Sequence, residues 1–151
     1  MNKITCKKNT CILVLYVCLL NAVAVFAQNP NIDSLKKKLA TNKEDTGRVN
    51  TLNELGSACY AERNYELSGH YGQLALTLAK KLNYPKGQAA AYGLVGRHYL
   101  KNNRYSEALQ SFQPALEMNK KLGEHNEIAQ SCIDIAGVQY NMGNYGEAVK
   151  Y

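Results

Sequence analysis

Apolar residues recur along this chain with the spacing of an amphipathic helix. Leu52, Leu55 and Cys59 lie at positions i, i+3 and i+7. Residues with this spacing share one face of a helix, so they predict a helix with a single apolar stripe. Forty residues later the same spacing returns in three further apolar residues, which are Tyr92, Val95 and Tyr99.

A second apolar stripe follows each of these helices after a short polar break. The first of these stripes begins at Tyr65 and the second at Tyr105. Each break contains asparagine or glycine, residues that typically end a helix. The pattern therefore predicts an all-α chain without strands, with helices near 32–40, 45–62, 65–82, 86–102, 105–122 and 126–142.

The chain repeats itself at a step of 40 residues. The motif Ala-Leu-x-x-x-Lys-Lys-Leu begins at Ala75 and again at Ala115, and tyrosine recurs at 65, 105 and 145. A single register that links so many positions is the signature of a repeat array. We expect units near 44–83 and 84–123, and an incomplete third unit at 124–151.

Small residues stand at fixed places in the repeats, and with the tyrosines they resemble the tetratricopeptide repeat in a 40-residue form. Gly56 and Gly96 occupy one register, and Ala75 and Ala115 another. Gly72 departs from the pattern, because the second unit has phenylalanine there. The resemblance covers roughly 44–151. HEAT and armadillo arrays share the period, but they do not require this glycine, tyrosine and alanine pattern.

The resemblance implies a right-handed α-solenoid of stacked antiparallel helix pairs, truncated in its third repeat. Solenoids of this kind bind a protein or peptide ligand in a concave groove lined by the first helix of each pair. By spacing, the candidate groove contacts are Asn50, Asn53, Ser57, Tyr60, Arg97, Lys101, Gln130 and Asn141. These polar and cationic side chains suit a peptide backbone or a carboxylate.

One subclass of the family grips the C-terminal carboxylate of chaperones with a set of lysine, asparagine and arginine residues. The matching positions here are Asn53, Ser57, Leu94, Gln130 and Asp134. None of these five has the side chain that its place in the clamp requires, so the sequence does not support that class of partner.

The first 27 residues have the composition of a secretory signal peptide. Lys3, Lys7 and Lys8 precede an apolar run, and small residues precede a predicted cut between Ala27 and Gln28. An uncleaved anchor is the alternative, although the run from 12 to 27 is shorter than the roughly 20 residues of a spanning helix. A lipoprotein signal would require a small residue where Val17 stands. We expect export to the periplasmic or extracytoplasmic side of a bacterial membrane, with a lead-in at 28–43.

Removal of the signal would change the charge of the chain. The formal net charge is +6, and without the three signal lysines 15 basic residues face 12 acidic ones, a net of +3. This mild charge does not favour a nucleic-acid partner. The cysteines that remain, Cys59 and Cys132, are expected to be unbonded, because they lie two units apart.

No motif in the sequence indicates catalysis. His70, His98 and His125 are isolated, and no Cys-x-x-Cys pair is present, so we expect no metal site. The pair Gly93 and Gly96 lacks the third glycine and the preceding strand of a dinucleotide fingerprint, so no cofactor is expected. Pro114 lies inside a predicted helix and predicts a bend there.

Two functions remain open from the sequence. The first is a non-catalytic exported scaffold that binds a protein or peptide. The second is the extracytoplasmic sensing region of a larger sensor histidine kinase, because residues 32–56 resemble the start of exported repeat regions in that family. The helix that begins at Asn144 has only about two turns before Tyr151, so further repeats are expected after it. Membrane contact is expected only through a downstream segment.

Overall fold

The fold consists of α-helices in the predicted order. The computed structural model describes residues 30–41 and 43–151, and these residues contain no strand. The helices are α2 (Pro30–Thr41), α3 (Thr46–Ala61), α4 (Tyr65–Lys81), α5 (Pro85–Lys101), α6 (Tyr105–Leu122), α7 (His125–Asn141) and the short α8 (Tyr145–Ala148). The all-α prediction is confirmed, with the six predicted helices placed to within two residues. The predicted signal peptide lies outside the described residues.

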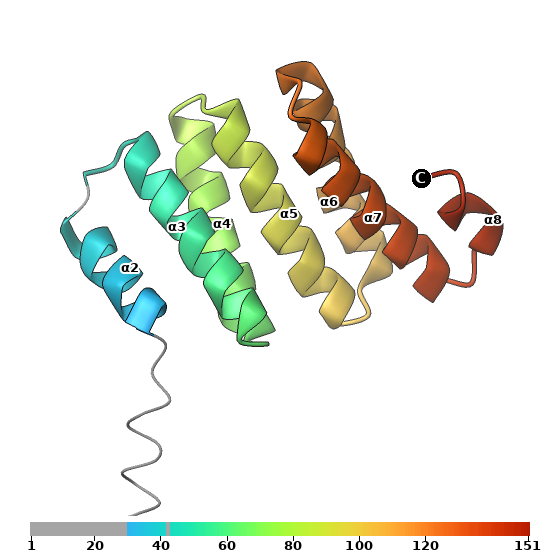
Figure 1. Ribbon diagram of the computed structural model, residues 1–151, viewed down its shortest axis with the longest axis horizontal. Coiled ribbons are helices and arrows are strands. Elements are labelled where there is room, and N and C mark those ends of the chain that lie inside the picture. The colour runs from blue at the N-terminus through green and yellow to red at the C-terminus, as the bar shows by residue number, and fades with distance from the viewer. Residues whose placement is uncertain (1–29, 42) are drawn as a thin grey trace, which may run out of the picture.

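The helices form two layers, as Figure 1 shows. Helices α3, α5 and α7 lie side by side in one layer, and α4 and α6 lie behind them. Each helix packs on the next along the chain, and α5 also contacts both α3 and α7, whereas no Cα atoms of α4 and α6 lie within 8 Å. The front helices therefore converge while the rear ones diverge, which is the curvature of a solenoid. No described helix is long and apolar enough to cross a membrane.

Each of the turns between α3 and α8 contains one residue in the left-handed backbone region. These residues recur every twenty positions, at Arg63, Asn83, Asn103, Gly123 and Gly143, with φ between 47° and 79°. The next residue donates its N–H to the carbonyl five positions back, for example Asn64 to Cys59 at 2.9 Å and Arg104 to Tyr99 at 2.9 Å. This is the hydrogen bond of a Schellman helix end. It reverses the chain within three residues and sets the antiparallel pairing.

Close approach between helices requires the glycines of the first-helix register. A Cβ added at Gly96 would lie 2.5 Å from the Phe112 ring, which is fully buried. In the first unit, Gly72 replaces this phenylalanine, and Leu94 of the next unit fills the space: a Cβ at Gly56 would lie 2.6 Å from its Cδ1. The space left by the missing phenylalanine ring at Gly72 is therefore filled by a leucine of the next unit.

The two cysteines of the described residues are far apart in the fold. Cys59 is buried and Cys132 half-buried, and both are free. No Cα atoms of α3 and α7 lie within 8 Å, and a disulfide needs roughly 7 Å or less. Burial raises the pKa of the Cys59 thiol.

Helix α6 continues without a break through Pro114, and the bend there stays a prediction.

Substitution at Gly96 tests the close packing of α5 against α6. Gly96→Ala should lower the free energy of unfolding by about 1–3 kcal/mol, because its methyl group would overlap the Phe112 ring. Gly93→Ala, in the same helix, meets nothing within 4 Å and should raise stability by about 0.5–1 kcal/mol. Urea titration of the two variants checks this. Equal stabilisation by both alanines would contradict the packing described.

Candidate functional site

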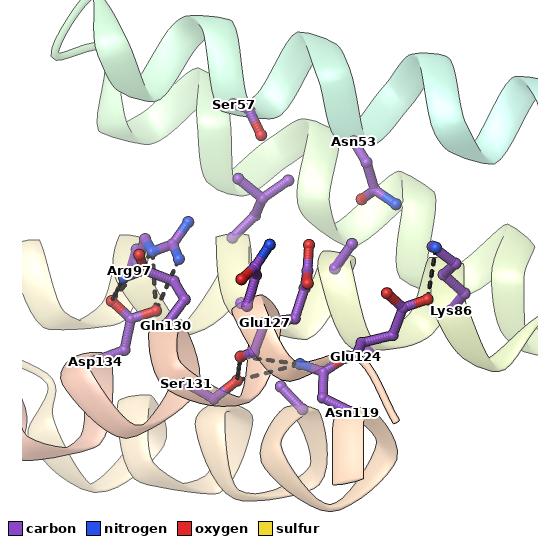
Figure 2. Close-up of a pocket in the computed structure, with 16 residues that line it drawn as sticks. Asn53, Ser57, Lys86, Arg97, Asn119, Glu124, Glu127, Gln130, Ser131 and Asp134 are labelled. Carbon is purple, nitrogen blue, oxygen red and sulfur yellow. Dashed lines mark hydrogen bonds and ion pairs between the residues drawn. The ribbon is translucent and has the colours of Figure 1, made fainter. Parts of the chain in front are cut away.

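A cavity opens where the front helices converge. Its volume is about 400 Å³, and residues of α3, α5, α6 and α7 line it. Figure 2 shows polar side chains from α3 above and α7 below, directed toward one another. The volume lies within the range of about 300–1,000 Å³ typical of ligand pockets.

Four of the eight predicted groove contacts meet at this cavity. Asn53 and Ser57 line it from α3, Arg97 from α5 and Gln130 from α7. These residues belong to three different repeat units, so the stacking of the units brings them together. Whether they contact a ligand stays a prediction.

The other four predicted contacts lie outside the cavity lining and interact locally. The Asn50 Oδ1 accepts a hydrogen bond from the Tyr84 hydroxyl at 3.2 Å. The Tyr60 ring lies 5.8 Å from the Arg97 guanidinium, and the Lys101 ammonium lies 5.2 Å from the Tyr65 ring. Asn141 Nδ2 donates to the Gly137 carbonyl at 2.8 Å.

Arg97 is held by a carboxylate on the facing helix. Its Nη2 and Nε donate to Asp134 Oδ2 at 2.8 and 3.0 Å, and Gln130 Nε2 donates to Oδ1 at 3.2 Å. The side chains of Arg97 and Asp134 are only 22% and 12% exposed. A bidentate pair in this partly buried setting is among the stronger ion pairs. Sequence reasoning considered Asp134 only as a missing clamp residue and did not find this pair.

A second ion pair lies at the other end of the cavity and was also missed from the sequence. Lys86 Nζ lies 2.6 Å from Glu124 Oε1. The hydrogen bond and charge of Glu124 raise the pKa of Lys86, and the more distant Glu127 adds to this effect. Lys86 therefore stays protonated and already has an acidic partner.

The floor of the cavity contains a buried polar pair. Asn119 and Ser131 are each 6% exposed. Asn119 Nδ2 donates to Ser131 Oγ at 3.2 Å and to the Glu127 carbonyl at 3.3 Å, and Ser131 Oγ donates to the same carbonyl at 2.7 Å. One unit earlier these two positions hold Ala79 and Ala91. This paired change from alanine was a signal in the sequence that could have revealed the pair.

The side-chain amide of Asn53 has its nitrogen paired and its oxygen unpaired. Its Nδ2 donates to the Gly87 carbonyl at 3.1 Å. Its Oδ1 is buried and has no hydrogen-bond partner. An unpaired buried carbonyl is costly, so such an atom calls for an explanation.

The histidines do not assemble a chemical site. His98 Nδ1 lies 3.2 Å from the Tyr65 carbonyl, and the ring packs where a side chain at Gly69 would stand. It therefore contributes to the contact between α4 and α5 rather than to the cavity. Among residues 30–41 and 43–151, no cluster of three or more histidine, cysteine or acidic residues could hold a metal ion.

The buried pair on the cavity floor can be tested by a double-mutant cycle. Asn119→Ala should lower stability by about 1–3 kcal/mol, since it deprives Ser131 and the Glu127 carbonyl of a donor. Adding Ser131→Ala should cost little more, because the double variant copies the Ala79 and Ala91 pair. Thermal and urea unfolding of the two single variants and the double variant measures the coupling. Strictly additive losses would contradict a paired role.

Comparison with known proteins agrees with this geometry. The sequence profile described as tetratricopeptide repeat matches residues 47–121. Curated protein sequences give no match. The crystal structure of aspartyl phosphate phosphatase F from Bacillus subtilis has a similar fold, with a TM-score of 0.68 and 18% sequence identity. The likeness covers 76% of this chain but 30% of that one, and at this identity it indicates the fold alone. Over residues 47–121, the chain belongs to the tetratricopeptide repeat family.

Proposed function

We propose that the protein is a non-catalytic scaffold that binds a peptide segment of a partner protein in the cavity between α3, α5 and α7. The observation that carries this proposal is the convergence of polar side chains from three repeat units on one cavity of about 400 Å³. Tetratricopeptide repeats typically bind proteins, and solenoids use the concave face for extended ligands. Amide side chains such as Asn53 and Gln130 can pair with the donors and acceptors of a peptide backbone.

Blocking the cavity tests the proposal. Gly93 lines the cavity from α5, and a Cβ at this position meets nothing within 4 Å. Gly93→Trp should therefore fill the cavity without disturbing the helix packing. A random heptapeptide phage library panned on the protein supplies the peptides, and synthetic copies are measured by fluorescence polarisation.

We expect Gly93→Trp to weaken peptide binding about tenfold or more, because the indole occupies the space of the ligand. The matched control is Gly137→Trp on α7, which also meets open space but does not line the cavity. Circular dichroism shows whether both variants keep their helices. Peptides that bind the two tryptophan variants equally well would contradict a binding role for the cavity.

A second candidate is the sensing part of a larger signalling protein. The observation that favours it is the similar fold of a structure titled aspartyl phosphate phosphatase, in which the matching part is 30% of the chain. The fold thus occurs there as part of a longer protein. The coding sequence that follows residue 151 tests this candidate: a spanning segment of about 20 apolar residues and then a kinase domain would support it, and a stop codon shortly after further repeats would oppose it.

Export of the protein is also a proposal, supported by the lysines and the apolar run within residues 1–27. In a bacterial host, the exported protein should begin at Gln28 because the signal is removed after Ala27. Intact-mass measurement of periplasmic and cytoplasmic fractions checks this. A protein that stays in the cytoplasm with residues 1–27 attached would contradict export.

A further inference from the structure

We propose that the peptide segment taken by this cavity carries a basic side chain, lysine or arginine, with the Glu127 carboxylate as its counter-ion. This inference rests on the proposed function and adds the chemistry of the ligand. It depends on which charges and hydrogen-bonding groups in the cavity are already paired.

The charged residues of the cavity lining do not balance. Two cations, Lys86 and Arg97, stand against three carboxylates, Glu124, Glu127 and Asp134, which is a net charge of −1. Lys86 pairs with Glu124 at 2.6 Å, and Arg97 with Asp134 at 2.8 Å. Glu127 makes no ion pair within 4 Å among the residues that the structure describes. The cavity is therefore locally negative in a chain whose formal net charge is +6.

The unpaired carboxylate belongs to a well-fixed residue. The Glu127 carbonyl accepts from both Asn119 and Ser131, which anchors this turn of α7 to α6. In Figure 2 the Glu127 side chain rises from α7 into the space below Asn53 and Ser57. Its carboxylate is thus presented to the cavity from a rigid helix rather than from a loop.

Two amide oxygens of the lining residues also take part in no hydrogen bond. The Asn53 Oδ1 is buried and has no partner. Asn119, only 6% exposed, uses its Nδ2 in two hydrogen bonds, and its Oδ1 takes part in none of the hydrogen bonds found across residues 30–41 and 43–151. Both residues line the cavity. A group rich in N–H donors would pair with Glu127 and with the Asn119 acceptor.

Lysine and arginine are the side chains that combine positive charge with several donors and no acceptor. An acidic side chain would meet Glu127 and would have to compete with Asp134 or Glu124 for a cation. A peptide carboxylate, suggested by the two cations of the predicted groove, is therefore disfavoured. An apolar side chain would leave Glu127 without a counter-ion and the Asn119 acceptor without a donor.

The test uses the same phage-selected heptapeptides and one charge-neutral substitution. Glu127→Gln removes the unpaired carboxylate and keeps the size of the side chain. The matched control is Glu117→Gln, which removes the same charge from an exposed residue of α6 that pairs with Lys120 at 3.2 Å and does not line the cavity. Synthetic versions of the tightest-binding peptide carry norleucine or glutamate in place of each basic residue.

We expect the selected peptides to be enriched in lysine or arginine, and Glu127→Gln to weaken their binding about fivefold, as for a partly screened ion pair. Glu117→Gln should leave binding unchanged. Glu127→Lys should prefer the glutamate version of the peptide, and wild-type affinity should fall as salt is raised. These outcomes together support the inference.

Two other outcomes are distinguishable from each other. Peptides that lose binding in Gly93→Trp but contain no basic residue, or that bind Glu127→Gln as tightly as wild type, would overturn the basic-ligand inference and leave the proposed function standing. Peptides whose binding is unaffected by Gly93→Trp, or the absence of any binding peptide, would overturn the proposed function and this inference with it.

Discussion

The close approach of α5 to its neighbours is the contact on which the rest of the structure depends. Gly96 has no side chain, so the Phe112 ring of α6 can lie directly against the α5 backbone. On the other side, Leu94 occupies the space between Gly56 and Gly72. The stability of an array comes from such contacts between neighbours. Because α5 contacts both α3 and α7, it also fixes how the front helices converge.

The cavity follows from this convergence. Its walls come from helices that are far apart in sequence, and small residues such as Ala89 and Gly93 of α5 leave room between them. Its ion pairs join α5 to the start of α7 and to the middle of α7. The pairs hold the two helices in register and at the same time neutralise the cations. Among the charged groups of the lining, the Glu127 carboxylate is left without an ion-pair partner, and that is the basis for inferring a basic ligand.

The sequence predicted the elements of the fold and much less of the site. Helix positions were accessible because the apolar spacing and the 40-residue step are local signals, and glycine or asparagine marks four of the five turns; Arg63 is the exception. The pairs of Arg97 with Asp134 and of Lys86 with Glu124 were not accessible, because each joins side chains 37 or 38 positions apart across a unit boundary. Spacing places a residue on a helix face but does not say which charge it meets there.

NMR chemical-shift mapping tests the central claim, which is that the ligand binds on the face where α3, α5 and α7 converge. In a ¹H–¹⁵N NMR titration of the protein with a capped, lysine-containing peptide, we expect the largest shifts at amides of these three helices around Asn53, Gly93 and Glu127. Helices α4 and α6 should shift little apart from the floor at Asn119, since they form the rear layer. Largest shifts along the outer surfaces of α4 and α6 would contradict the account.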